Sequence, residues 1–189
     1  MRVSGGTLRG RPVRVPAGVI RPTMDRMRES VFATLGDLSA CSFLDLFSGS
    51  GIIALEAASR GAASVEAIEK DPLKRKTLLE NVAIAPIRIN CRFMAVELYV
   101  QRAKNQQPFD IIFCDPPFPY PFKWELVQAI AASPLMGSAS RLVIHRPRED
   151  RPPASLARLA LQQTKLYGRS MVDFFVHTEL DHDIDSQSC

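Results

Sequence analysis

Short apolar runs alternate with helical stretches along most of this chain, and this alternation restricts the fold more than any other feature of the sequence. The apolar, β-prone runs are spaced so that a helix fits between most neighbouring pairs. Strands connected in this way run parallel, and helices then pack on the sheet. The pattern therefore predicts an α/β protein with a Rossmann-like, mostly parallel seven-stranded sheet that helices cover on both faces.

The element boundaries follow from the apolar runs and from the prolines and glycines between them. We expect strands over residues 43–47, 64–69, 87–91, 109–114, 141–145, 163–167 and 171–178. We expect helices over residues 50–60, 72–85, 96–103 and 124–132, with a short one over 156–161. Ligands of such sheets bind at the carboxyl ends of the strands, so side chains at those ends are the first candidates for a functional site.

The N-terminal part of the chain differs from this repeating pattern. Residues 2–16 combine short β-prone pieces with Gly5, Gly6 and Gly10, which predicts a small β-hairpin. A helix then follows, capped by Thr23 and closed by Gly36, with apolar residues on one face. We divide the chain into a basic N-terminal segment (residues 1–22), the main domain (23–180) and an acidic, disordered tail (181–189).

The composition of the chain indicates its cellular location and the partners that it lacks. No apolar run reaches the roughly 18 to 20 residues of a membrane span, and the first residues lack the apolar core of a signal peptide. The four cysteines lack the spacing of a zinc site or of a disulfide framework. We expect a cytoplasmic protein without a bound metal and without a membrane partner. No long apolar face favours a dimer, so a monomer is expected.

The positive charge of the chain is concentrated near its start. Residues 1–36 hold seven arginines against two acidic residues, whereas the chain as a whole has a net charge of +4. Arginine suits bidentate contacts to phosphate, so Arg9, Arg11 and Arg14 are candidates for RNA binding. A merely solvated basic arm remains the alternative interpretation.

A glycine turn follows the strand at residues 43–47. Gly49-Ser50-Gly51 begins a G-x-G-x-x-A pattern at the start of a helix, and Glu69 lies twenty residues after Gly49 at the end of the next strand. This arrangement is typical of a nucleotide-type cofactor site, with the acid on the ribose hydroxyls. The pattern alone fits NAD as well as S-adenosylmethionine.

Asp45 distinguishes these two cofactors by charge. A carboxylate beside the turn repels the pyrophosphate of a dinucleotide, but it attracts the ammonium and sulfonium groups of S-adenosylmethionine. The sequence therefore favours the methyl donor. A structural role of Asp45 as a helix cap or turn residue is the competing interpretation.

The run Asp115-Pro116-Pro117-Phe118 follows the strand at residues 109–114, which places it in the same cleft as the glycine turn. An exocyclic base amine is a weak nucleophile, and the Asp115 carboxylate and the Pro116 carbonyl can accept its two N–H groups. Prolines keep such a turn rigid, and Phe118 offers a face for base stacking. A simple strand-ending turn is the alternative.

These motifs together resemble the class I amino-methyltransferases. The N-terminal runs Arg2–Arg11 and Arg21–Phe32 narrow the resemblance to the RsmD family, over residues 1 to about 178. That resemblance implies a class I S-adenosylmethionine-dependent methyltransferase fold and methylation of a guanine N2 amine, at guanine 966 of 16S ribosomal RNA, in the RNA or in an assembling small subunit.

The resemblance also assigns residues. It places Asp45, Phe47, Gly49, Gly51, Glu69, Arg21, Thr23 and Met94 at the cofactor, and Asp115, Pro116, Pro117 and Phe118 at the catalytic site. Where the family often has a short polar residue against adenine, this chain has Phe93-Met94. We therefore expect adenine to be held by packing and backbone contacts. His145 stands where the family tends to carry an acid, and we interpret it as a hydrogen-bonded structural histidine.

Three other functions fit part of the pattern. An adenine-N6 methyltransferase shares the catalytic motif, but it would need a target-recognition region for which 189 residues leave little room. An oxidoreductase fits the glycine turn, but not Asp45 or the proline motif. A non-catalytic RNA-binding module has no use for the carboxylates Asp45, Glu69 and Asp115.

Overall fold

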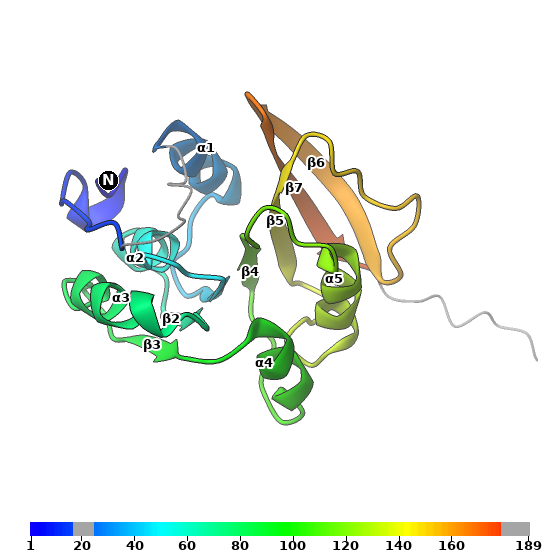
Figure 1. Cartoon of the computed structure of the whole chain (residues 1–189), viewed down its shortest axis with the longest axis horizontal. Coiled ribbons are helices and arrows are strands. Elements are labelled where there is room, and N and C mark those ends of the chain that lie inside the picture. Colours follow the sequence, from blue (N-terminus) through cyan, green and yellow to red (C-terminus); the bar gives the residue numbers. More distant parts are fainter. Residues whose placement is uncertain (17–24, 179–189) are drawn as a thin grey trace, which may run out of the picture.

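The computed structural model describes residues 1–16 and 25–178 (Figure 1). Its strands are β1 (Ser42–Leu46), β2 (Ser64–Ile68), β3 (Ile89–Arg92), β4 (Ile111–Cys114), β5 (Arg141–Pro147), β6 (Leu159–Tyr167) and β7 (Ser170–His177). Its α-helices are α1 (Asp25–Leu35), α2 (Ile52–Ser59), α3 (Arg75–Val82), α4 (Val96–Arg102) and α5 (Lys123–Ala132), with short 3-10 helices η1 (Gly6–Leu8) and η2 (Pro72–Lys74).

The strands form one seven-stranded sheet in the order β3-β2-β1-β4-β5-β7-β6. Strands β1 to β5 pair in parallel, whereas β7 is antiparallel to both β5 and β6. The predicted mostly parallel α/β sheet is thus confirmed. The order of the strands reverses direction between β1 and β4, and a ligand crevice opens at such a point.

Successive residues of the strands point to opposite faces of the sheet, and each face carries its own hydrophobic core. Phe43 of β1 packs with residues of α1, α2 and α3, and the next residue, Leu44, packs with residues of α4 and α5. Figure 1 shows α1, α2 and α3 on one side of the sheet and α4 and α5 on the other. Helices on both faces explain why β4 is buried along its whole length.

The N-terminal segment (residues 1–16) forms a short version of the predicted hairpin. Arg2 and Pro12 form an antiparallel bridge with a backbone hydrogen bond on either side of it, and a 3-10 turn lies between the two paired pieces. Gly6 determines the shape of this turn. Its φ is +73°, and a Cβ atom there would lie 1.9 Å from the carbonyl oxygen of Ser59 in α2. The chain therefore turns tightly against α2, and the paired part of the hairpin stays short.

A buried ion cluster attaches this segment to the helices. Glu56 of α2 is fully buried, and its carboxylate accepts hydrogen bonds from the Ser4 N–H at 2.6 Å and from Nε of Arg28 and of Arg60, each at 3.3 Å. Arg28 of α1 is also fully buried and donates to the Arg2 carbonyl at 2.7 Å. Removing one member of such a cluster leaves the other charges buried without compensation.

Other predicted boundaries also need correction. The helix expected over 156–161 is wrong, because β6 begins at Leu159 and pairs with β7 from there. Arg158 has a φ of +64°, which a helix does not allow. The helix expected over 72–85 is divided into η2 and α3. Within residues 1–16 and 25–178, no helix has both the length and the apolar character needed to cross a membrane.

Candidate active site

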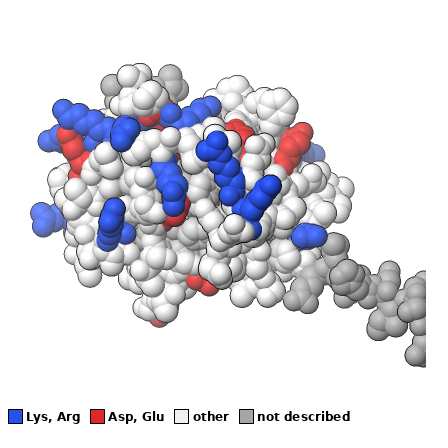
Figure 2. Space-filling model, turned by 90° about the horizontal axis from the view of Figure 1, so that it is seen from below, with Lys and Arg blue, Asp and Glu red and all other residues white. Residues whose placement is uncertain are grey.

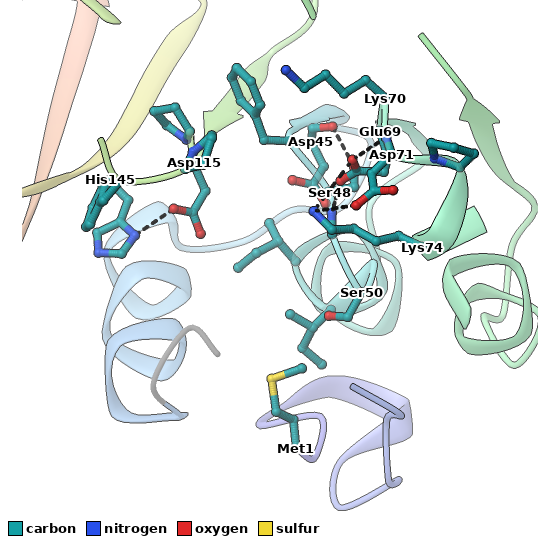
Figure 3. Close-up of a pocket in the computed structure, with 18 residues that line it drawn as sticks. Met1, Asp45, Ser48, Ser50, Glu69, Lys70, Asp71, Lys74, Asp115 and His145 are labelled. Atoms are coloured by element: carbon teal, nitrogen blue, oxygen red, sulfur yellow. Dashed lines mark hydrogen bonds and ion pairs between the residues drawn. The ribbon is translucent and has the colours of Figure 1, made fainter. Parts of the chain in front are cut away.

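A cavity of about 560 Å³ opens at the carboxyl ends of β1, β2, β4 and β5 (Figure 3). It contains eight of the predicted site residues: Asp45, Phe47, Gly49, Glu69, Asp115, Pro116, Pro117 and Phe118. It is completed by residues that were not assigned to the site from the sequence: Met1, Ser48, Ser50, Ile52, Ile53, Lys70, Asp71, Pro72, Lys74 and His145. The structure thus brings the glycine turn and the proline motif together.

Strand periodicity explains why the polar side chains meet. In each of four neighbouring strands, a core residue faces α1, α2 and α3, and a polar residue follows two positions later at the strand's carboxyl end. Side chains two positions apart share a face of a strand. The four pairs are Phe43 and Asp45, Ala67 and Glu69, Phe113 and Asp115, and Val143 and His145.

Asp45 lies at the base of the cavity and is 1% exposed. Its Oδ2 accepts the N–H of Ala54 at 3.1 Å, so the carboxylate also caps the first turn of α2. Burial raises the pKa of Asp45 well above its ordinary value, the Ala54 N–H opposes this shift, and the carboxylates of Asp115 and Glu69 add to it. Such a carboxylate stabilises a cationic group brought next to it.

The backbone between β1 and α2 turns sharply at its glycines. Gly49 has a φ of +55° and Gly51 one of +78°. A Cβ atom on Gly51 would lie 3.0 Å from Cγ1 of Val82, so this glycine allows α2 to pack closely on α3. Gly51 is not among the residues that line the cavity, and its contribution is to the helix packing behind the turn.

Glu69 joins the glycine turn to the loop after β2. Its Oε2 accepts the N–H of Gly49 and its Oε1 accepts the N–H of Asp71, each at 2.8 Å. Lys74 Nζ lies 3.7 Å from Oε1. Each carboxylate oxygen can accept two hydrogen bonds, so Glu69 retains acceptor capacity toward a ligand in the cavity.

The proline motif forms the opposite wall of the cavity. Asp115 directly follows β4, and its N–H donates to the carbonyl of Leu46 at 3.3 Å, which ties the motif to the end of β1. The Phe118 ring lies in the same wall, with Nζ of the buried Lys123 at 5.3 Å from its centroid. Lys123 forms an ion pair with Asp150. Lys123 belongs to none of the motifs recognised in the sequence.

His145 was expected to be a hydrogen-bonded structural histidine without a catalytic role. It is hydrogen-bonded, and its partner belongs to the cavity: its Nδ1 lies 2.7 Å from Oδ1 of Asp115. Its Nε2 is buried with no hydrogen-bond partner within the described residues. The two-residue alternation within each strand puts His145 and Asp115 on the same face of the sheet, and the register between β4 and β5 makes them neighbours.

The remaining predicted residues lie elsewhere. Met94 packs against the core formed with α4 and α5 and does not line the cavity, and Arg21 and Thr23 lie outside the described residues. Arg9 and Arg11 are exposed, and Arg14 forms a 2.7 Å ion pair with Glu80 at the surface. Figure 2 shows Lys and Arg side chains scattered over one face of the molecule, with fewer Asp and Glu side chains among them. Within the described residues, no cluster of His, Cys, Asp and Glu could hold a metal ion.

The strand order, the antiparallel β7 and the carboxylate-lined cavity beyond the glycine turn define the fold of a class I S-adenosylmethionine-dependent methyltransferase. Comparison with known proteins identifies the family. A family model described as "Conserved hypothetical protein 95" matches residues 1–176. The chain belongs to this family, which is the RsmD family that the sequence motifs resemble.

Individual relatives are similar to the chain over different lengths. The chain is 31% identical to "Ribosomal RNA small subunit methyltransferase D" of Escherichia coli K12, over 89% of this chain and 86% of that protein. The solved structure of a hypothetical protein from a Thermus species has a TM-score of 0.81 and 30% identity, covering 94% of this chain and 99% of its own. A "tRNA1(Val) (adenine(37)-N6)-methyltransferase" of Shewanella loihica is 31% identical, over 42% of this chain and 34% of that protein.

Proposed function

We propose that this protein transfers the methyl group of S-adenosylmethionine to a guanine N2 amine of 16S ribosomal RNA. The observation that carries the proposal is the position of Asp115 and Phe118 across one cavity from Asp45 and Glu69. A base-binding wall and a donor-binding wall then face each other. The name of the Escherichia coli relative, a small-subunit ribosomal RNA methyltransferase, supports the RNA substrate.

The donor-binding wall suits S-adenosylmethionine, which supplies an electrophilic methyl group on a positively charged sulfur. Asp45 offers a buried negative charge for the cationic part of the donor, and the free acceptor capacity of Glu69 suits the two ribose hydroxyls. A cavity of about 560 Å³ lies within the range of small-molecule sites. The dinucleotide alternative remains disfavoured, because the carboxylates that line this cavity would repel a pyrophosphate.

The base-binding wall prepares the amine for attack. The Asp115 carboxylate and the Pro116 carbonyl accept the two N–H groups, which turns the nitrogen lone pair toward the methyl carbon, while Phe118 stacks on the base. The nitrogen forms the new N–C bond as the C–S bond breaks, and the bonding electron pair stays on sulfur. The methylated amine then carries an extra proton, which it loses to water.

One experiment tests the reaction and the substrate together. We expect 16S RNA from cells that lack the protein to have lost one N2-methylguanine, as measured by nucleoside mass spectrometry, and the purified protein to restore it with S-adenosylmethionine. Both the RNA and the assembling small subunit are offered as substrates. An unchanged nucleoside profile would contradict the proposal.

Adenine N6 is the second candidate target. The match to the adenine-N6 enzyme of Shewanella loihica favours it over part of the chain, and Asp115 can accept an adenine amine in the same way. The same mass spectrometry distinguishes the two targets. Loss of N6-methyladenine with N2-methylguanine unchanged would establish the second.

Asp45 gives a prediction in which stability and binding change in opposite directions. A carboxyl group whose pKa rises on folding destabilises the folded state at any pH above its unfolded pKa, and asparagine removes this cost while keeping an acceptor for the Ala54 N–H. We expect Asp45→Asn to raise the melting temperature of the ligand-free protein at pH 7, by about 2 to 4 °C for each kcal/mol added to the free energy of unfolding. We expect it to weaken S-adenosylmethionine binding by about tenfold.

Calorimetry and thermal melts at pH 5 and pH 7 measure both effects. The stabilisation should shrink at pH 5, because the native Asp45 is then more protonated and its burial costs less. A variant that melts lower and still binds the donor normally would show that Asp45 acts only as the cap of α2.

The arginines of the N-terminal segment give a prediction on RNA affinity. If Arg9 and Arg11 contact phosphates, replacing both with glutamine should reduce the slope of log affinity against log salt by about 1 to 2. Arg102, exposed at the end of α4, is a matched control whose change to glutamine should alter the slope less. Equal slopes for all three proteins would favour a solvated arm that does not bind RNA.

A further inference from the structure

His145 is a buried side chain in the wall of the cavity for which the proposed reaction so far has no use. It lies in β5 and is 5% exposed. Cys114 of β4 and Ile144 of β5 are paired in the parallel register, so Asp115 and His145 are the next residues on two adjacent strands. Both side chains point to the same face of the sheet, where Figure 3 shows them in contact.

The contact between them has a defined direction. Nδ1 of His145 lies 2.7 Å from Oδ1 of Asp115. An ionised carboxylate can only accept a hydrogen bond, so Nδ1 carries the hydrogen and donates it. Nε2 is buried and has no partner within the described residues. Within the described residues, the hydrogen bond to Asp115 is therefore the polar contact that orients the imidazole ring.

The same ring also supports the base-binding wall. The centroids of the Phe118 and His145 rings are 5.2 Å apart, and the ring planes meet at 57°. This distance and tilt are typical of favourable aromatic packing. His145 thus touches both the carboxylate and the aromatic ring that are proposed to hold the target base.

We propose that His145 is a positioning residue for methyl transfer. Its Nδ1–H holds Oδ1 of Asp115, so that the carboxylate keeps the orientation in which it accepts the amine N–H, and its ring fixes the position of Phe118. This inference rests on the proposed function of the cavity. It gives His145 an effect on the transfer rate, with little effect on donor binding, because its contacts are with the base-binding wall.

Two amide variants separate the nitrogen positions. The side-chain amide nitrogen of asparagine can occupy the place of Nδ1, whereas that of glutamine reaches toward the place of Nε2. We expect His145→Asn to keep most of the single-turnover rate, and His145→Gln and His145→Leu to lower it about 10- to 100-fold, the range for losing a hydrogen bond to a charged group. S-adenosylmethionine affinity, measured by calorimetry, should change less than about threefold in all three variants.

His177 provides the matched control. It lies in β7, its Nδ1 is also buried without a partner within the described residues, and its register places it at the other end of the sheet from His145. His177→Leu should leave the transfer rate near that of the native protein. Circular dichroism melts of all the variants compare their folding, so a rate difference between the folded Asn and Gln variants still decides the question.

The outcomes distinguish this inference from the proposed function. In an Asp115→Ala background, His145→Leu should cause a smaller loss of rate than it does in the native protein, because the hydrogen-bond partner of His145 is absent and only its contact with Phe118 remains. A native rate in His145→Leu, or equal losses in the Asn and Leu variants, would overturn the positioning role. A native rate in Asp115→Ala alone would instead overturn the proposed function of the cavity.

Discussion

Asp115→Ala is expected to lower the single-turnover rate of methyl transfer by at least about a hundredfold while S-adenosylmethionine binding stays nearly native. The carboxylate is proposed to orient the target amine, and misplacement of a reacting group by about 1 Å can cost this much. Asp115 directly follows β4, is hydrogen-bonded to His145 and lines the same cavity as Glu69, in the wall that is proposed to bind the base. Rapid quenching with a radiolabelled donor measures the rate, and calorimetry measures donor binding.

The asparagine variant distinguishes geometry from charge. Asp115→Asn should be intermediate, because an amide oxygen still accepts an N–H from the amine, although the amide cannot act as a base. An asparagine variant as inactive as the alanine variant would show that Asp115 acts through its charge. Asp110 lies at the other end of the same strand and hydrogen-bonds Ser42, so Asp110→Ala should lower stability without a comparable loss of transfer rate.

Glu69→Ala is expected to produce the largest loss of donor affinity, about 10- to 100-fold. The carboxylate accepts two backbone N–H groups, from Gly49 and Asp71, and is proposed to accept the ribose hydroxyls as well. Each hydrogen bond to a charged group contributes about 1.5 to 3 kcal/mol. The alanine variant therefore loses the proposed contacts to the ribose hydroxyls, and it also weakens donor binding indirectly because the glycine turn loses its contact to Glu69. Calorimetric titration with S-adenosylmethionine measures the change.

The control for this prediction comes from the same strand. Glu66 of β2 is paired with Arg92 by a 2.6 Å contact and does not line the cavity, so Glu66→Ala should bind the donor normally. Glu69→Gln should bind better than Glu69→Ala, because its amide oxygen can keep one of the two N–H contacts. Normal binding by Glu69→Ala would remove this residue from the donor site.

The central part of the fold could be predicted because its determinants are local. The strand expected over 43–47 is found at Ser42–Leu46, since a run of apolar residues between turn residues leaves few alternatives. In the N-terminal segment the antiparallel pairing was predicted but the tight turn against α2 was not, because that turn depends on the approach of Gly6 to Ser59, more than fifty residues away. The helical pattern at 156–161 was also misleading, because the strand there forms by pairing with β7, a contact that is not local in the sequence.

The site was predictable to a similar extent. Asp45, Glu69 and Asp115 belong to recognisable motifs, and the parallel sheet brings them to one edge. His145 belongs to no such motif, and its role depends on the register between β4 and β5, which sequence periodicity does not specify. Gly51 belongs to a recognisable motif but does not line the cavity. Its lack of a side chain allows Val82 of α3 to approach closely behind the turn.

The attachment of the N-terminal segment to α2 affects how RNA binding can be studied. Val3 and Val13 are buried in the main core, and Ser4 donates to the buried carboxylate of Glu56. Deleting residues 1–16 would uncover that core and leave Glu56 with fewer donors, so the shortened chain would unfold more easily. Loss of RNA methylation in such a truncation would report a damaged domain, and the contribution of this segment to RNA binding has to be measured by exchanging its exposed arginines one at a time.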